Sequence, residues 1–263
     1  MKALIAGWRD LSTVDIIGEP CFTAWFCGCN FRCPWCQNWP IVECRDCREV
    51  EVSYIAEKAL ESKMLVDFIH VTGGEPTLQY EALSELYQRV KEGGMKTSLD
   101  TNGAKPEVVE RLVPLLDHLA LDIKAPLTNV EKYAQAIGLP VELVERNHIV
   151  DKVKKSLEIG LKHLSKIEIR FPVVPKIHSE SDVIEALLQV AEIVDSAKAW
   201  SKAVFVLQQY VPSETVPSVL FRNEPMTDPE LLRKIAHRAL REIDSLNKVY
   251  IRTIERVEKI EKF

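Results

Sequence analysis

Residues 66–101, "VDFIHVTGGEPTLQYEALSELYQRVKEGGMKTSLDT", contain one complete strand–helix–strand unit. Two β-rich runs, 66–72 and 95–101, flank the segment 78–94, whose apolar residues recur at helical spacing until a glycine pair ends it. A strand, a crossover helix and a second strand predict two parallel neighbours in one sheet.

The same alternation extends over most of the chain. Further strands are predicted near 21–26 and at 118–124, 166–174, 203–210 and 248–254. Further helices are predicted at 53–64, from Pro106, across about 129–163 with a break at 138–140, at 181–194 with Ser181 as N-cap, and from Pro229 after Asp228 to about 245. Six strand–helix units and one extra strand are fewer than the eight units of a full barrel.

The sequence therefore predicts an α/β fold, a partial (β/α)6 TIM-like barrel with an extra C-terminal strand. A doubly wound open sheet is the alternative. We expect one domain over residues 1–263, with a core at about 15–210 and a C-terminal extension at about 211–263.

The composition argues against some classes of function. The net charge is −5, which implies no basic face and disfavours a nucleic-acid partner. No apolar run approaches the roughly 18 residues of a membrane span, and Arg9 and Asp10 interrupt the apolar N-terminus too early for a signal peptide. We therefore expect a cytoplasmic protein without a membrane partner. Because cytoplasmic thiols are kept reduced, metal binding or catalysis is favoured over a disulfide framework.

All seven cysteines lie between Cys21 and Cys47. Cys29, Cys33 and Cys36 have the spacing C-x3-C-x2-C, which suits a compact loop around an iron–sulfur cluster and leaves one iron of a four-iron cluster open. The spacing to the second pair, Cys44 and Cys47, does not match a zinc ribbon, but structural zinc stays open.

Polar motifs follow four of the predicted strands. They are "TGGEP" after 66–71, "DTNG" after 96–99, "DIK" after 119–121 and "PVVPKIH" after 167–171. Because the carboxyl ends of parallel strands meet at one edge, these motifs predict a single shared pocket.

The cysteine triad, with Trp35 before its third member, and the "GGEP" motif at 73–76 resemble the radical S-adenosylmethionine (SAM) superfamily. The stretches 12–38, 72–79, 100–103 and 121–126 resemble its glycyl-radical enzyme activases more closely. Within that branch the chain is most similar to the activating proteins of anaerobic ribonucleoside-triphosphate reductase, which are related to pyruvate formate-lyase activase.

This resemblance implies that Cys29, Cys33 and Cys36 hold a [4Fe–4S] cluster whose open iron binds SAM. The reduced cluster would cleave SAM to methionine and a 5′-deoxyadenosyl radical that abstracts hydrogen. The residues expected around SAM are Trp35, Gly73, Gly74, Glu75, Asp100, Thr101, Asn102, Asp122, Lys124 and Arg170.

Several of these residues have specific expected roles. Glycines 73 and 74 would let the backbone approach SAM, and Glu75 would hold its ammonium group. Oxygens of Asp100, Thr101 and Asp122 would bind a monovalent cation, and Lys124 would balance the SAM carboxylate.

The fourth motif departs from the family pattern. Arg170 would face the SAM carboxylate or pair with Glu168, and Phe171 stands where the formate-lyase activase has a histidine. His178 either substitutes for that histidine or is an exposed loop residue, and His70 is expected to be buried with its hydrogen bonds satisfied.

Four cysteines lie outside the triad. Cys21, Cys27, Cys44 and Cys47 could form an auxiliary metal site or a regulatory disulfide. The expected partners are a glycyl-radical enzyme and a flavodoxin- or ferredoxin-like electron donor. The alternatives are a radical SAM enzyme acting on a small molecule or nucleoside, closed by residues of about 203–263, and a non-catalytic iron–sulfur or zinc protein.

Overall fold

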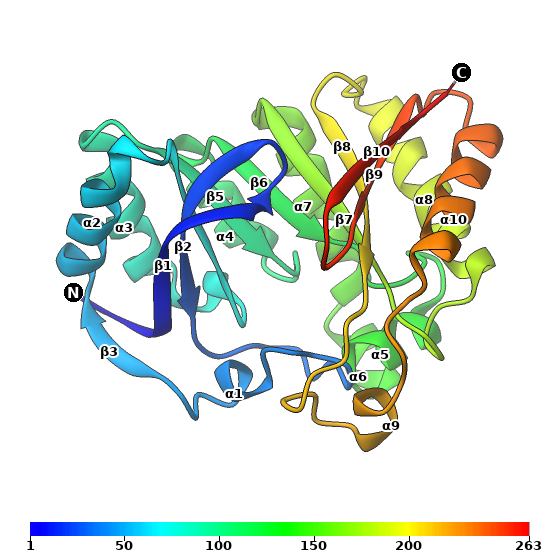
Figure 1. The fold of residues 1–263 in the computed structure, drawn as a ribbon, viewed down its shortest axis with the longest axis horizontal. Helices are drawn as coiled ribbons and strands as arrows, with labels where there is room; N and C mark the ends of the chain where they lie inside the picture. Colours follow the sequence, from blue (N-terminus) through cyan, green and yellow to red (C-terminus); the bar gives the residue numbers. More distant parts are fainter. Residues whose placement is uncertain (263) are drawn as a thin grey trace.

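The computed structural model describes residues 1–262, which form one ten-stranded sheet in the order β10-β9-β8-β7-β6-β5-β4-β2-β1-β3 (Figure 1). The strands are β1 (Lys2–Ile16), β2 (Glu19–Phe26), β3 (Arg48–Glu51), β4 (Phe68–Gly73), β5 (Lys96–Thr101), β6 (His118–Asp122), β7 (Lys166–Val173), β8 (Ala203–Gln209), β9 (Lys248–Arg252) and β10 (Val257–Glu261).

The strands from β2 through β4 to β9 are parallel and follow chain order. A doubly wound sheet would reverse its strand order at a switch point, and this sheet does not. The predicted partial barrel with an extra C-terminal strand is therefore confirmed. Three antiparallel edge strands, β1, β3 and β10, were not predicted. In β1 the pattern is obscured because Arg9 and Asp10 interrupt it and the pairing with β2 shifts register three times.

Helices lie along the outside of the curved sheet, with α2 and α3 on one flank and α8 and α10 on the other (Figure 1). The α-helices are α1 (Trp39–Val42), α2 (Val52–Glu61), α3 (Tyr80–Glu92), α4 (Pro106–Leu112), α5 (Val130–Ile137), α6 (Val141–Arg146), α7 (Ile149–His163), α8 (Glu180–Ser196), α9 (Val219–Arg222) and α10 (Pro229–Glu242). The 3-10 helices are η1 (Ser62–Met64), η2 (Pro76–Gln79) and η3 (Val113–Leu115). None of the helices among residues 1–262 combines the length and the apolar character needed to cross a membrane.

The helix boundaries follow local signals in the sequence. Asp228 caps α10 as expected, but the N-cap of α8 is Ser179 rather than Ser181. Ser179 and Asp182 form a reciprocal capping box, which satisfies two backbone N–H groups and fixes the start of α8 two residues earlier than expected. Gly138 ends α5 in the left-handed conformation, at φ 67°.

The inside of the barrel is polar. Thr23, His70, Ser98 and His118 occupy paired positions on four adjacent strands, and all four are buried. Ser98 Oγ lies 2.8 Å from His70 Nδ1 and 2.7 Å from His118 Nδ1. His70 is thus a buried, hydrogen-bonded residue, as predicted. Most side chains that alternate with this row are apolar and pack under the helices, and the buried Thr97 of β5 is an exception.

Candidate active site

The cysteine-rich loop, residues 27–47, connects β2 to β3 and lies at the carboxyl edge of the parallel strands (Figure 1). It is fixed to the turn after β4, because Gly74 N donates to Phe26 O at 2.8 Å and Glu75 N donates to Gly28 O at 2.7 Å. The loop therefore lies directly against the "GGEP" motif.

Steric limits explain the glycine pair in that motif. A Cβ on Gly73 would lie 2.1 Å from Phe26 O, and one on Gly74 would lie 2.0 Å from Gly28 O. Gly73 also has φ 126°, which side chains rarely adopt. The glycines thus permit close contact with the cysteine-rich loop, a constraint that the sequence analysis did not foresee.

One cavity at this edge collects most of the predicted site residues. From that set it is lined by Cys29, Cys33, Trp35, Cys36, Gly73, Gly74, Asp100, Thr101, Asn102, Asp122 and Lys124. Motifs separated by up to about a hundred residues in the chain therefore share one cavity, as their strand-end positions predicted.

Three further lining residues, Thr72, Pro172 and Val174, belong to the predicted strand-end motifs. The lining residues that were not predicted include Phe31, Gln37, Asn38, Val42, Gln208, Gln209, Tyr210 and Val211. Residues 208–211 lie at the end of β8, the same structural position as the other motifs. Their position at the end of a predicted strand could have indicated that residues 208–211 line the cavity. Their residue types, however, form no recognisable motif.

The three thiols of the triad are held in their neutral form by the protein alone. Burial raises the pKa of Cys29 to about 12 and that of Cys33 to about 12, and it also raises the pKa of Cys36. A bound metal would have to displace these protons, since thiolates are the ligating form.

Lys124 is a buried cation in the cavity wall. Its ammonium donates to the Asp122 carboxylate at 2.8 Å and lies 5.1 Å from the centre of the Trp35 ring. Burial alone would lower the pKa of Lys124, but the Asp122 carboxylate outweighs burial and raises it. Trp35 is fixed in turn, because its Nε1 donates to Ala136 O at 2.9 Å.

Glu75 does not line the cavity, although the sequence placed it on SAM. Its fully buried carboxylate accepts bonds from Thr77 N and Oγ1, from Thr101 Oγ1 and from Asn102 N. Protein donors surround the carboxylate in this structure, and its expected contact with the SAM ammonium stays a prediction. Glu75 orients Thr101 and Asn102, which do line the cavity.

Arg170 also lies outside the cavity lining. It pairs with Glu168 at 3.1 Å, which is the second of its two expected roles, and with Asp100 at 3.2 Å. Asp100 receives a further bond from Thr72 Oγ1 at 2.8 Å. Burial raises the pKa of Asp100, and the neighbouring Arg170 only partly offsets this effect.

His178 is neither exposed nor in the cavity wall, so neither expected role fits. Its Nδ1 accepts from Val174 N at 3.1 Å, and its Nε2 donates to Lys124 O at 2.7 Å. The ring thereby connects the backbone after β6 to the backbone after β7. Phe171, the departure from the family pattern, is buried and stacks on Phe205.

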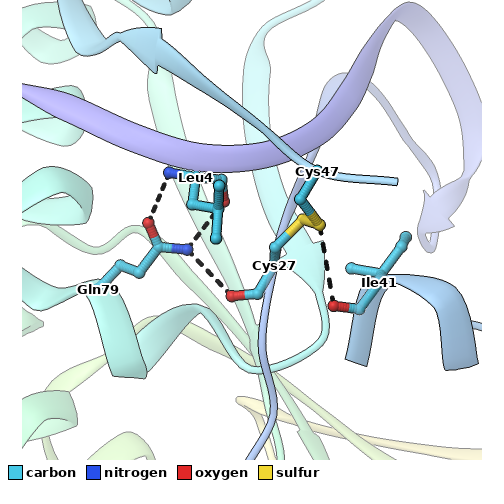
Figure 2. The surroundings of a disulfide bond; sticks show 5 residues. All are labelled: Leu4, Cys27, Ile41, Cys47 and Gln79. Atoms are coloured by element: carbon cyan, nitrogen blue, oxygen red, sulfur yellow. Dashed lines mark hydrogen bonds between the residues drawn. A yellow bond between two sulfur atoms is a disulfide. The ribbon is translucent and has the colours of Figure 1, made fainter. Parts of the chain in front are cut away.

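The four remaining cysteines have different surroundings, and an auxiliary metal site among them stays a prediction. Cys27 and Cys47 form a disulfide (Figure 2), Cys21 is buried beside Thr23 Oγ1 at 3.5 Å, and Cys44 is free and exposed. The expectation of reduced thiols is wrong for Cys27 and Cys47, because the fold brings their Cα atoms to 6.3 Å across a sequence separation of 20.

Residues 1–262 contain no preformed site for a single metal ion. Over residues 1–262, no three His, Cys, Asp or Glu side chains are grouped closely enough to hold one metal ion. Tetrahedral zinc needs its ligands around one point. In an iron–sulfur cluster each thiolate binds a different iron, so the spread of Cys29, Cys33 and Cys36 around one cavity suits a cluster.

A family model described as the radical SAM superfamily matches residues 24–197, the segment that contains the cysteine triad and the strand-end motifs. The chain belongs to the radical SAM superfamily. Membership implies a [4Fe–4S] cluster and SAM as cofactors. Three thiols, a buried ammonium and two carboxylates in one cavity are a donor set that fits both groups.

Two relatives of this radical SAM protein carry the names of activating enzymes. A Methanocaldococcus jannaschii protein provisionally named as a glycyl-radical enzyme activating enzyme is 32% identical over 256 residues, covering 97% of this chain and 98% of that protein. The pyruvate formate-lyase-activating enzyme of Staphylococcus aureus is 30% identical over 210 residues, covering 74% of this chain and 77% of the enzyme.

A solved structure of TYW1 with a lysine-pyruvate adduct bound has a TM-score of 0.61 and 18% identity, covering 92% of this chain and 79% of TYW1. At that identity the likeness supports the fold alone. It agrees with the partial barrel described above.

Proposed function

We propose that this radical SAM protein activates a glycyl-radical enzyme by installing a glycyl radical on it. The observation that carries the proposal is the single cavity lined by the cysteine triad and by residues of all four strand-end motifs. The match to the Methanocaldococcus jannaschii protein over 97% of this chain supports the activating type.

Cys29, Cys33 and Cys36 are the proposed cluster ligands. A cluster held there would supply one electron for the reductive cleavage of SAM, and the radical so formed would take hydrogen from the target glycine. The protein holds the ligands in place through backbone bonds, such as Arg32 N to Ile137 O at 2.8 Å. Aromatic side chains, Phe31 and Trp35, line the same cavity and limit the access of water.

The charged residues of the cavity are proposed to bind SAM. Lys124, with its raised pKa, stays protonated and can balance the SAM carboxylate. Asp100, Thr101 and Asp122 supply oxygens for an ammonium group or a monovalent cation. Asn102 donates to Asn30 Oδ1 at 2.8 Å and so connects this group to the cysteine-rich loop.

The partner is proposed to be an enzyme of the anaerobic ribonucleoside-triphosphate reductase type, with a flavodoxin- or ferredoxin-like protein as electron donor. The sequence resemblance to that activase branch supports this choice. A glycine-bearing loop of the partner would have to reach the same cavity.

A second function, catalysis on a small molecule or nucleoside, is favoured by one observation. Residues 208–211 form part of the cavity wall, and the segment that follows contacts the cysteine-rich loop. Thr215 Oγ1 donates to Gln37 O at 2.5 Å, and Ser218 N donates to Pro34 O at 3.3 Å. A C-terminal segment that closes the cavity suits a small substrate better than a protein loop.

Electron paramagnetic resonance separates the two functions. The reconstituted protein is mixed anaerobically with SAM, a low-potential reductant and a candidate glycyl-radical enzyme. A glycyl doublet, together with methionine and 5′-deoxyadenosine, is expected. The matched control is the same partner with its target glycine replaced by alanine, which should abolish the doublet. SAM cleavage without a doublet from any candidate partner would overturn the activase proposal and leave the small-substrate function.

A further inference from the structure

The Cys27–Cys47 disulfide joins the two ends of the cysteine-rich loop (Figure 2). Cys27 follows the last residue of β2, and Cys47 precedes the first residue of β3. All three cysteines of the triad lie between them in the sequence. The bond therefore closes the base of the segment that carries the proposed cluster ligands.

The two halves of the disulfide have different surroundings. Cys27 is 3% exposed and firmly held, because its N donates to Leu4 O at 2.9 Å and its O accepts from Gln79 Nε2 at 3.1 Å. Gln79 is itself bonded to Leu4 N and O, as Figure 2 shows.

Cys47 lies on the accessible side. It is half-buried and follows the exposed residues 44–46. Its Sγ lies 4.0 Å from Ile41 O, a weak contact for sulfur. Besides the disulfide, this end of the loop is anchored on one side by Arg48, which pairs with Ile5 of β1, and by bonds within the turn before it. Gly28 N also donates to Ile41 O at 2.9 Å.

We propose that Cys27 and Cys47 are a redox-active pair that a dithiol reductant opens, and that their state sets how firmly the loop 27–47 is held. One thiolate of the dithiol attacks the Sγ of Cys47, the less buried residue of the pair, and Cys27 leaves and takes up a proton. The second thiolate of the dithiol then attacks the mixed disulfide and releases Cys47 as a thiol. Two electrons and two protons pass to the protein, and the dithiol becomes a disulfide.

The consequence for the cluster rests on the proposed function, since it takes the triad as the cluster ligands. With the disulfide intact, both ends of the loop are joined and the ligands are pre-organised. Reduction removes the cross-link, while the sheet still anchors Cys27 and Arg48 to β1. The segment between these anchors gains conformational freedom, so that bound iron should be released faster, by about tenfold for each ~1.4 kcal/mol of lost restraint.

The redox pair is tested first without any cluster. The apo protein is equilibrated in dithiol–disulfide buffers of graded potential, its thiols are alkylated, and the modified cysteines are counted by peptide mass spectrometry. The count is expected to rise from the five free cysteines to all seven, with Cys27 and Cys47 changing together. Seven alkylated cysteines in every buffer, or five in the most reducing one, would overturn the proposal.

Variants extend this test. Cys44→Ser is the matched control, because Cys44 is an exposed cysteine of the same loop outside the disulfide, and it should keep the transition. Cys47→Ser should abolish the transition. If Cys47→Ser does not fold, trypsin cleavage after Arg45 in the oxidised and reduced wild-type protein gives a second measure of loop order. Faster cleavage after reduction is expected, and equal rates would count against the proposal.

Iron release is then measured by absorbance with a chelator on reconstituted protein in each redox state. Faster release after reduction, on the order of tenfold, is expected because the cross-link no longer restrains the segment before Arg48. Equal rates with a normal thiol transition would overturn the control of the cluster loop. Failure to bind iron and sulfide at all would instead count against the proposed function, so the two failures are distinguishable.

Discussion

Arg170 Nη1 lies 3.2 Å from the carboxylate of Asp100, so a cation inside the barrel holds an acidic residue of the cavity wall. The same guanidinium pairs with Glu168, which also accepts from Arg252 at 3.0 Å. Glu168 is fully buried and Arg170 is 4% exposed. The cavity wall thus depends on a charge network in which the partners compensate one another.

Arg170→Met is expected to leave buried carboxylates without their cation and to lower the free energy of unfolding by about 3–5 kcal/mol. Chemical denaturation of the apo protein measures this change. Lys176→Met is the control, because it breaks a surface pair with Glu224 and should cost less than about 1 kcal/mol. Equal losses in the two variants would show that the buried network has no special role.

Cys33→Ala should prevent formation of the iron–sulfur cluster, because it removes one proposed ligand from the cavity wall. Iron and sulfide analysis after anaerobic reconstitution, with the visible absorbance, measures the loss. Cys44→Ala should keep the wild-type content, since Cys44 is outside the cavity lining and the disulfide. If Cys44→Ala loses the cluster as well, the assignment of ligands is wrong.

Gly74→Ala should disrupt the contact between the "GGEP" turn and the cysteine-rich loop, because the added Cβ would lie 2.0 Å from Gly28 O. We expect a loss of about 2 kcal/mol or more in stability and weaker SAM binding. Gly18→Ala is the matched control, since Gly18 has φ +80° with nothing within 4 Å of the added atom. Gly18→Ala should lower the free energy of unfolding by about 1–2 kcal/mol, because alanine must adopt the left-handed conformation there, and it should leave SAM binding unchanged. Isothermal titration with SAM and thermal denaturation separate the two effects.

Stability should fall as the pH decreases below about 6.5, the pKa of an unfolded histidine. Burial lowers the pKa of His70 to about 3, and it lowers the pKa of His178 to about 4. Both rings stay neutral in the folded protein at pH 5.5, whereas these two residues together bind about two protons in the unfolded chain. The two neutral rings therefore contribute their full stabilisation above pH 6.5. The free energy of unfolding should fall by about 3 kcal/mol as the pH decreases from 7.5 to 5.5.

Urea denaturation at several pH values tests this dependence. His178→Gln removes one titrating group while it keeps a hydrogen-bond donor and an acceptor. The slope of its unfolding free energy against pH, between pH 6 and 5, should therefore correspond to the uptake of about one proton fewer on unfolding. The difference between the slopes of the variant and the wild type reports on His178 alone. The buried carboxylates Glu75 and Asp100 are present in both proteins, and their raised pKa values increase stability as the pH falls. Identical slopes would contradict the neutral state of His178.

Local signals in the sequence were sufficient for much of the fold. The strand-end positions of "TGGEP", "DTNG" and "DIK" predicted one shared cavity, because parallel strands place their carboxyl ends at one edge. The antiparallel strands β1, β3 and β10 were missed. Their pairing depends on distant partners, and their own periodicity is weak.

The sequence by itself determined the order of strands and helices, the cysteine spacing and the motifs that share the cavity, since each is a property of neighbouring residues. Only the tertiary structure decided which atoms meet. It paired Cys27 with Cys47, surrounded Glu75 with donors from the turn and from β5, and gave Arg170 two carboxylate partners. Such contacts join residues far apart in the chain, and their energies depend on burial and distance, which no local pattern encodes.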